Sequence, residues 1–385
     1  MKSFTKSFFF VSAILFFIIM VLYIRQQYSL DKYISFASSN CFQSIATLPP
    51  LLTHQGDVID VYLIDIDAIE ILQRNCRSAP KFPISVMIAH SDETIRMNHK
   101  IYNVSVYVDK GDYVYLPNEE KAFKKQDHHK IGPILVPFDL GKFKKIHERS
   151  RLISCLNINM NRTNAKQHLP QNFEVKLAEL RDALMNMDAM PFLAGGTLLG
   201  WYRECAIIPH TYDADFGVLK TDLKSNMFEQ LKALSGFKLS RRLGRNFDSL
   251  EFTVTATGGG SIDIFIVYDE VDDDRVYTAG LDNVKGRRFK WIIPRAKGYC
   301  SGILGGRLFY VPCNVEETLR PNMADEWAVD EVNEAVDVAP AFELKSDLPE
   351  VKLFGKWNHQ EAMLLLCTGA REVAFRNIKS AWPTS

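Results

Sequence analysis

The feature that most constrains this fold is a set of acidic residues beside or within apolar, strand-like segments. In GGTLLGWYRECAIIPHTYDADFGV, residues 195–218, Asp213 and Asp215 lead into an apolar run, and Asp263 interrupts another, SIDIFIVYD. A buried carboxylate is costly unless a cation or donor meets it. Residues two apart on a strand face the same way, so neighbouring strands would bring these three carboxylates together. We expect them to bind Mg²⁺ or Mn²⁺, hard cations that prefer oxygen ligands.

A glycine pair, Gly195 and Gly196, precedes these aspartates by a short amphipathic run. Glycines let backbone approach a phosphate closely, and a helix that begins after them offers free amides to that anion. The Asp-x-Asp pair alone is a weak signal. Asp213 is also explained as a surface loop charge, and Asp215 as a capping residue.

The composition admits two folded domains and gives no indication of a polyanion-binding surface. The chain has 385 residues, 47% hydrophobic and 24% charged, which is enough to bury a sizeable core. Lysine plus arginine equals aspartate plus glutamate at 46 each, so the formal net charge is zero. Nucleic-acid-binding domains normally carry a basic excess or patch, and we expect no nucleic-acid partner.

The N-terminus predicts a membrane anchor. Residues 8–24 carry no charge and reach about 25 Å as a helix, slightly short of an average bilayer core. Lys2 and Lys6 favour a cytosolic tail over residues 1–7, with the remainder in the lumen. We expect an uncleaved signal anchor and a single-pass type II protein. The alternative is a cleaved signal peptide, for which SFASS offers a candidate site, although such apolar regions are usually shorter.

Two further features agree with a lumenal body. The sequons NVS at Asn103 and NRT at Asn161 are candidate N-glycosylation sites, although sequons also occur by chance. All seven cysteines lie beyond the apolar run, and in an oxidising lumen some of them should pair. The sequence does not indicate their connectivity.

The remaining chain divides into a stem and two folded regions. We expect the stem over 25–54, a smaller α/β domain over 55–160 and a catalytic domain over 165–385. In the first domain DVYLIDIDAIEIL predicts a strand that runs into a helix, and ISVMIAH, IYNVSVYVD and YVYLP predict strands. The charged stretch NEEKAFKKQDHHK, residues 118–130, predicts an exposed loop.

The second region alternates helices and strands before ending in strands. NFEVKLAELRDALMNM has helical spacing, with Asn172 as the expected N-cap. Strand PFLAGG, helix TLLGWYREC, strand ADFGVL and a helix over DLKSNMFEQLKAL follow, and then the strands FKLSRRL, SLEFTVTAT and SIDIFIVYD. In SLEFTVTAT we expect Glu251 to be an exposed strand carboxylate. The fold class is α/β (α+β), with a mixed sheet in the catalytic domain.

The glycine pair, the spaced helix, Asp-x-Asp and the later strand aspartate form the pattern of the nucleotidyltransferase fold. With DSLEFTV, SIDIFIVYDE and FKWIIPRA, the chain resembles the fukutin and LicD-type phosphotransferase family. The resemblance covers residues 172–335 well, with a looser echo in DVYLIDIDAIEIL. The anchor and overall size fit the fukutin branch, to which we expect the chain to belong.

The resemblance implies a Golgi or ER type II membrane protein that acts on the O-mannosyl glycan of dystroglycan. Such enzymes are expected to transfer ribitol 5-phosphate from CDP-ribitol to a sugar hydroxyl, releasing CMP. The implied partners are a CDP-activated alditol donor, a glycoprotein acceptor and other enzymes of the fukutin family. A relative with the same scaffold could carry another alditol or head group, because fold does not set substrate.

Carried over to this sequence, the resemblance makes Asp213, Asp215 and Asp263 both catalytic and metal-binding. Gly195, Gly196 and Thr197 would then line the phosphate end of the donor. Basic residues that could contact phosphate are Arg203 and, with less support, Lys290 and Arg295. For Arg203 an ion pair with Glu204 is an equally good explanation, because a guanidinium suits either anion.

Three alternatives remain open. Asp65 and Asp67 in LIDID also resemble the nucleophile motif of haloacid dehalogenase-type phosphatases, but the lysine and acidic pair that such enzymes need are not evident. A metal-dependent glycosyltransferase would use Asp-x-Asp on a nucleotide sugar in the same way. A non-catalytic lumenal partner of glycosylation enzymes is the third. We favour the phosphotransferase, and a non-catalytic role for Asp65 and Asp67.

Overall fold

The computed structural model describes the central part of the chain. The described residues are 53–54, 57–58, 60–73, 81, 83–89, 102–131, 134–160, 165–270, 274–282 and 287–319. The expected anchor over 8–24, the stem up to residue 52 and the sequon at Asn161 lie outside them. Within this portion, no helix has the length and apolar character needed to cross a membrane.

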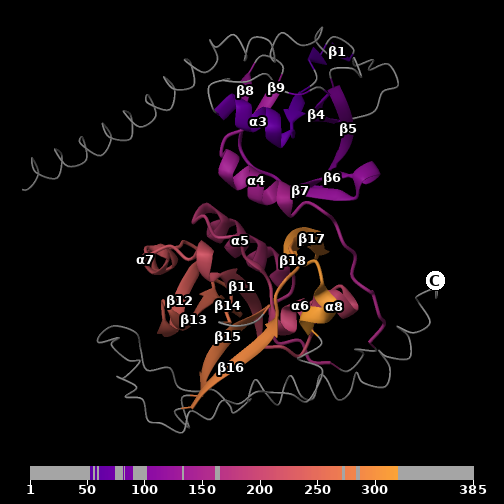
Figure 1. The fold of residues 1–385 in the computed structure, drawn as a ribbon. Coiled ribbons are helices and arrows are strands. Elements are labelled where there is room, and N and C mark those ends of the chain that lie inside the picture. The colour runs from indigo at the N-terminus through magenta and orange to yellow at the C-terminus, as the bar shows by residue number, and fades with distance from the viewer. Residues whose placement is uncertain are drawn as a thin grey trace, which may run out of the picture. The chain divides into compact units, whose positions relative to one another are not determined.

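The chain separates into two compact units (Figure 1). The first unit ends at Lys144 and omits two short segments before it. The second unit contains those segments, Lys110–Tyr113 and Glu120–Lys124, and the chain from Lys145 onward. Both units combine helices with a mixed sheet, which confirms the α+β class. Each is described separately below.

The first unit contains a mixed sheet with the strand order β6-β5-β4-β3-β9-β8. Strands β3 and β9 are parallel, as are β4 and β5, whereas β3 and β4 are antiparallel. A separate antiparallel pair is formed by β1 and β2. The elements are β1 (Thr53–His54), β2 (Asp57–Val58), β3 (Val61–Leu63), α3 (Ile66–Gln73), β4 (Ile84–Ala89), β5 (Tyr102–Asp109), β6 (Tyr113–Leu116), η1 (Pro117–Glu119), β8 (His128–Ile131), β9 (Ile134–Pro137) and α4 (Leu140–Glu148).

The predicted strand-to-helix passage is confirmed as β3 and α3, and Asp65 lies between them. Its Oδ1 accepts a hydrogen bond from the N–H of Ala68 at 2.8 Å, and its Oδ2 accepts one from Ser85 at 3.1 Å. Ala68 is the third residue of the helix, so Asp65 is its N-cap. Both carboxylate oxygens therefore have structural partners, which supports a non-catalytic role for this residue.

The prediction of an exposed loop over 118–130 is wrong. Its residues form the end of η1, strand β7 (Lys121–Lys124) and most of β8. Between the charged residues of this stretch lie two apolar ones, Ala122 and Phe123, which are 1% and 3% exposed. Burial of these side chains favours a strand where composition alone favours a loop.

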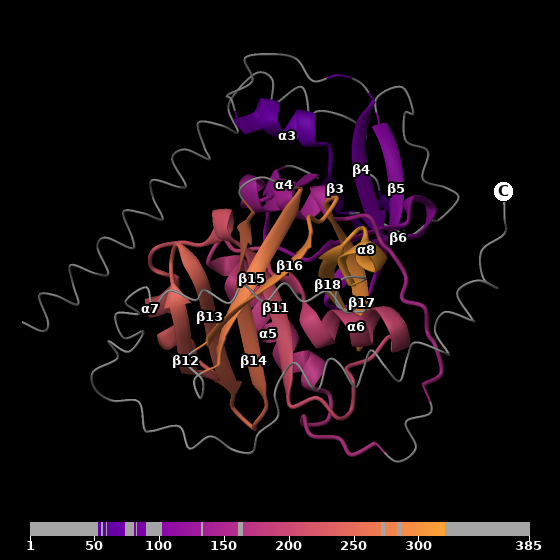
Figure 2. The same ribbon diagram turned by 60° about the horizontal axis from the view of Figure 1, so that its bottom comes forward.

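The second unit is built on a nine-stranded sheet, in which β11 pairs in parallel with β14 (Figure 2). Strand β10 likewise pairs in parallel with β18. The main strand order is β12-β13-β14-β11-β10-β18-β17, while β15 pairs with β14 and β16. The strands are β10 (Phe192–Leu193), β11 (Asp213–Leu219), β12 (Phe237–Arg245), β13 (Asp248–Ala256), β14 (Ser261–Asp269), β15 (Arg275–Asp282), β16 (Arg287–Pro294), β17 (Tyr299–Leu304) and β18 (Arg307–Pro312). The helical segments are α5 (Phe173–Asn186), α6 (Gly195–Glu204), η2 (Lys220–Asp222), α7 (Met227–Lys232) and α8 (Val315–Leu319).

The predicted helices and strands of this unit are present, but three details of the helices differ from the prediction. Asn172 precedes α5 as expected, but its φ is 55° and its side chain makes no capping bond. Helix α6 includes the glycine pair instead of following it. The helix expected over DLKSNMFEQLKAL is divided into η2 and the short α7. Asp222, at the end of η2, is buried and forms an ion pair with Lys145 at 2.9 Å.

Helix α6 is fixed to the hairpin β17–β18 by Trp201. This side chain is fully buried, and its Nε1 donates a hydrogen bond to the carbonyl of Ile303 at 3.0 Å. The indole occupies the space beside Gly302, where an added Cβ would lie 2.4 Å from the ring. One turn further along, the C-cap residue Cys205 is tied by a disulfide to Cys155. The position and rotation of the C-terminal half of α6 are therefore constrained.

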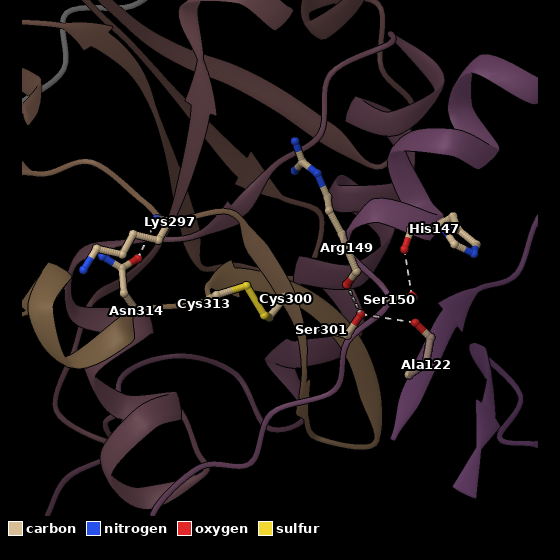
Figure 3. Close-up of a disulfide and its surroundings, with 9 residues drawn as sticks. All are labelled: Ala122, His147, Arg149, Ser150, Lys297, Cys300, Ser301, Cys313 and Asn314. Carbon is tan, nitrogen blue, oxygen red and sulfur yellow. Dashed lines mark hydrogen bonds between the residues drawn. A yellow bond between two sulfur atoms is a disulfide. The ribbon is translucent and has the colours of Figure 1, made fainter. Parts of the chain in front are cut away.

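The same hairpin carries a second disulfide, Cys300–Cys313 (Figure 3). Next to it, the buried Ser301 hydroxyl lies near the carbonyls of Ala122 and Arg149, at 3.3 and 2.9 Å. The described cysteines thus pair with one another, as an oxidising compartment would allow. Cys41, Cys76 and Cys367 lie outside the described residues.

A buried ion pair joins α5 to β18. Arg181 is 0% exposed, and its Nη1 and Nη2 donate to the two carboxylate oxygens of Asp112 at 3.0 and 2.8 Å. The N–H of Leu308 also donates to Asp112, and the Leu308 carbonyl accepts from Arg181. Burial alone would raise the pKa of Asp112, but the hydrogen bonds and charge of Arg181 outweigh it and lower the pKa to about 2.

Candidate metal centre

The structure brings the three predicted aspartates together. Strands β11 and β14 are parallel neighbours, and Asp215 lies directly opposite Asp263. Asp213 is two residues earlier on β11 and opposite Ser261, at the start of both strands. One carboxylate oxygen from each aspartate lies within 4.8 Å of those of the other two. We call these three residues the acidic cluster.

Asp215 is the most buried member of the cluster. Only 2% of it is exposed, and its Oδ1 has no hydrogen-bond partner among the described residues. Burial, followed by the charge of Asp213, raises the pKa of Asp215 well above its usual value. Hydrogen bonds from the backbone N–H groups of Thr197 and Gly196 lower it only in part. An ionised carboxylate here lacks a sufficient counter-charge.

Asp263 has partners, yet it remains difficult to ionise. It is 7% exposed, and the Thr253 hydroxyl donates to its Oδ1 at 2.5 Å. Burial and the charge of Asp213 raise its pKa to about 7, against the opposing charge of Arg241 and the Thr253 hydrogen bond. Arg241 Nη2 lies 3.6 Å from Asp263 Oδ2. A single guanidinium therefore offsets only part of the repulsion.

These observations fit a divalent cation. The cluster offers carboxylate oxygens at close spacing, and one buried oxygen of Asp215 has no partner among the described residues. Burial and the charge of Asp213 raise the pKa values of the other two aspartates. Hard cations such as Mg²⁺ take such oxygens as ligands and favour the ionised carboxylates. Asp213, Asp215 and Asp263 are the residues that would hold the ion.

Helix α6 begins against the cluster, which explains the glycine pair in this fold. The N–H of Asp215 donates to Thr197 Oγ1 at 2.8 Å, and the N–H of Thr197 donates to Asp215 Oδ2 at 3.4 Å. Gly195 has a φ of 50°, and a Cβ added there would lie 2.8 Å from Asp215 Oδ2. Close approach of the helix to this carboxylate therefore requires the first glycine. The expected contact of Gly195, Gly196 and Thr197 with a donor phosphate stays a prediction.

The substitution Gly195→Ala is expected to weaken binding of a divalent cation at least about tenfold. The added methyl group would displace Asp215, and a positive φ disfavours any side chain. Titration of the purified protein with Mn²⁺, followed by calorimetry, measures this. Gly196→Ala is the matched control, because its Cβ would lie 3.7 Å from Asp215 Oδ2, an ordinary contact. Equal affinities in the two variants would contradict the prediction.

Of the predicted basic residues, Arg203 and Arg295 have described side chains, and both form ion pairs away from the acidic cluster. Arg203 is buried in the last turn of α6, about 12 Å along the axis from Gly195, and its Nη2 donates to Glu204 at 2.6 Å. The alternative ion pair is thus present, and the contact of Arg203 with phosphate stays a prediction. Lys290 lies in β16, but its side chain is outside the described residues. Arg295 forms ion pairs with Asp269 and Asp274 at the surface.

Two charged residues near the cluster depart from expectation. Glu251 is 4% exposed, so its prediction as an exposed strand carboxylate is wrong. It accepts a hydrogen bond from Arg241, which the sequence reasoning did not single out. A bulge between Leu239 and Arg241 sets Arg241 opposite Thr253, and nothing in the sequence indicates this bulge. Of the sequons, Asn103 is exposed on β5.

The raised pKa of Asp263 predicts that Mg²⁺ stabilises this protein more at high pH. The carboxyl titrates near 3.8 when unfolded and near 7 when folded, so the folded state holds the proton more tightly between these values. The free energy of unfolding of the metal-free protein should therefore fall as pH rises through this window, by up to about 4 kcal/mol from this group. Melting temperatures with and without Mg²⁺ at pH 5 and pH 8 test it. If Mg²⁺ raises the melting temperature no more at pH 8 than at pH 5, the prediction is contradicted.

Comparison with known families matches both parts of the chain. Residues 189–314, which include the acidic cluster, match the family described as LicD/FKTN/FKRP, nucleotidyltransferase domain. Residues 50–154 match the W02B3.4-like N-terminal domain. The second match covers much of the first structural unit.

Individual relatives extend over both parts. The chain is 28% identical to the Caenorhabditis elegans protein W02B3.4 over 333 residues, 83% of this chain and 84% of that one. It is 32% identical to T07A5.1 of the same organism over 281 residues, 70% of each chain.

The chain is 29% identical to human ribitol-5-phosphate transferase FKTN over 206 residues, which is 51% of this chain and 44% of that protein. The chain therefore spans less than half of FKTN, and membership of the fukutin branch itself stays a prediction. The family matches and these relatives support a phosphotransferase-like role for the unit that carries the cluster. With its nucleotidyltransferase sheet and its match over the acidic cluster, the chain belongs to the LicD family.

Proposed function

We propose that this protein transfers an alditol phosphate from a CDP-activated donor to a sugar hydroxyl. The donor that we favour is CDP-ribitol, the acceptor is a protein O-mannosyl glycan of the dystroglycan type, and CMP is released. The observation that carries the proposal is the convergence of Asp213, Asp215 and Asp263 inside the LicD-family match. The name of the relative FKTN, a ribitol-5-phosphate transferase, supports the choice of donor.

The acidic cluster supplies what this chemistry needs. A bound Mg²⁺ or Mn²⁺ would neutralise charge on the donor diphosphate, as in phosphoryl transfer generally. The acceptor hydroxyl attacks the phosphorus that bears the alditol, the new O–P bond forms, and the bond to the CMP oxygen breaks. Asp263, a member of the acidic cluster, accepts the proton of the acceptor hydroxyl as the general base. Thr253 holds this carboxylate in place through its hydroxyl.

The compartment is part of the proposal. We place the protein in the Golgi or ER membrane as a single-pass type II protein, with both units in the lumen. The paired cysteines Cys155–Cys205 and Cys300–Cys313 and the exposed sequon Asn103 support an oxidising, glycosylating compartment. Complexes with other enzymes of the same family would place successive transfers on one glycan.

A donor screen tests the activity. The purified full chain is incubated with Mg²⁺, an O-mannosyl glycopeptide and one of CDP-ribitol, CDP-glycerol, CDP-choline or a UDP-sugar, and the mass added to the glycopeptide is measured. Addition of ribitol phosphate supports the proposal, whereas glycerol phosphate or phosphocholine would correct the donor. Addition of a sugar from UDP-sugar would favour the glycosyltransferase alternative. No transfer and no binding of CDP with Mg²⁺ would favour the non-catalytic partner.

A further inference from the structure

We propose that Arg241 binds the phosphate of the donor, at the edge of the acidic cluster that faces β12. This inference rests on the proposed function, because it identifies a residue that recognises the diphosphate of a CDP-linked substrate. It differs from the sequence expectation, which assigned phosphate contact to Arg203, Lys290 and Arg295. The argument depends on the position of Arg241, its partners and the donors that it leaves open.

Arg241 stands in a row of four residues that crosses four neighbouring strands. Backbone pairing sets Arg241 on β12 opposite Thr253 on β13, Thr253 opposite Asp263 on β14, and Asp263 opposite Asp215 on β11. Side chains in register across a sheet share one face, so the guanidinium lies on the face that carries the carboxylates. Its Nη2 is 3.6 Å from Asp263 Oδ2.

Two partners hold the guanidinium in one orientation. Nε donates to Thr253 Oγ1 at 3.1 Å, and Nη2 donates to the buried carboxylate of Glu251. Thr253 in turn donates to Asp263, so the arginine and this aspartate are linked through one hydroxyl. Such fixation reduces the entropy that a long side chain would lose on binding a ligand.

The remaining donors of Arg241 are open. Nη1 has no hydrogen-bond partner in the described part of the chain, and 42% of the side chain is exposed. In that same part, no other lysine or arginine forms an ion pair with the acidic cluster. Glu251 offsets the charge of the arginine locally, but it does not occupy Nη1. A planar guanidinium with free N–H groups is suited to phosphate oxygens.

The negative charge of the acidic cluster explains why a cation beside it would help a diphosphate to bind. Three carboxylates favour a divalent cation but repel the diphosphate that must approach it. A fixed cation beside Asp263 reduces this repulsion on one side and offers directed hydrogen bonds to the incoming phosphate. Arg242, the next residue, cannot substitute for it: its guanidinium lies over the Phe228 ring and donates to Asn246.

The test measures CDP and Mn²⁺ binding separately, by calorimetry on the purified full chain. Arg241→Gln is expected to weaken CDP binding, in the presence of Mg²⁺, about tenfold or more, as loss of a charge-assisted hydrogen bond implies. Mn²⁺ binding without nucleotide should be unchanged or tighter, because a positive charge near the carboxylates has been removed. A purely structural arginine would instead weaken Mn²⁺ binding, since the cluster would lose its arrangement.

Control variants make each outcome decisive. Arg241→Gln removes the hydrogen-bonded charge of Arg241 from the buried Glu251, so the double variant Arg241→Gln/Glu251→Gln is measured as well and should show the same selective loss of CDP affinity. Arg242→Gln removes the same charge from the same strand and should bind CDP as the parent protein does. If the parent binds CDP with Mg²⁺ and both Arg241 variants bind it equally well, the role of Arg241 is refuted while the proposed function stands. If the parent does not bind CDP, the proposed function itself fails.

Discussion

Asp215→Asn is expected to lower transfer by about 10³-fold or more and to abolish measurable Mn²⁺ binding. Asparagine keeps the shape of the side chain but removes the charge at the most buried position of the acidic cluster. Loss of a metal-held stabilisation worth several kcal/mol corresponds to this factor in rate. Because the native pKa of Asp215 is raised well above its usual value, the neutral amide should also leave the metal-free fold intact or stabilise it.

Three measurements on the same preparation check this result: transfer by mass spectrometry, Mn²⁺ binding by calorimetry, and the melting temperature. Asp269→Asn is the matched control, since it removes one carboxylate from the neighbouring strand β14 at an exposed position, with a side chain 70% accessible. It should change neither activity nor Mn²⁺ affinity. An Asp215→Asn protein that is folded and still transfers at the parent rate would overturn the site assignment.

Arg181→Met is expected to lower the free energy of unfolding by about 3–5 kcal/mol. The substitution leaves Asp112 buried with the N–H of Leu308 and Lys124 as its partners, and removes the hydrogen bond to the Leu308 carbonyl. The lowered pKa of Asp112 gives the same ion pair a pH dependence. Its contribution is present above the unfolded pKa near 3.8 and is lost as pH falls toward about 2.

Urea unfolding monitored by fluorescence and circular dichroism measures the effect of Arg181→Met. The double variant Arg181→Met/Asp112→Asn removes both charges while keeping an acceptor for Leu308, and should recover a substantial part of the loss. Lys176→Met is a suitable control on the same helix, because its ion pair with Glu179 is at the surface and such pairs contribute little. Equal stabilities for Arg181→Met and Lys176→Met would refute the buried pair as a major source of stability.

Strong local patterns predicted the elements of the fold, whereas competing local signals produced the errors. The apolar alternation of SIDIFIVYD predicted β14, and the helical spacing of NFEVKLAELRDALMNM predicted α5. The loop expected over 118–130 was wrong because charged residues outnumber Ala122 and Phe123, whose burial depends on the rest of the unit. Local composition contains no information about that burial.

The acidic cluster could be anticipated because an aspartate in an apolar strand is physically unusual. The environment of Glu251 could not, because its burial depends on Arg241 from the adjacent strand and on a bulge that sets their register. The glycine pair was expected to let the backbone approach a phosphate, and that contact stays a prediction. The approach seen here is that of the helix to Asp215, a contact that depends on the pairing of α6 with β11 in space.

The packing of Trp201 against Gly302 has a consequence for how inactive variants should be distributed along the chain. We expect a side chain at residue 302 to collide with the Trp201 indole and to shift helix α6, whose first turn contacts Asp215. Random mutagenesis scored by enzymatic output should therefore recover residue 302 together with the aspartates. Substitutions at residue 302 would resemble loss of a catalytic residue in such a screen. They would act instead from the β17–β18 hairpin, by moving helix α6 away from its position beside Asp215.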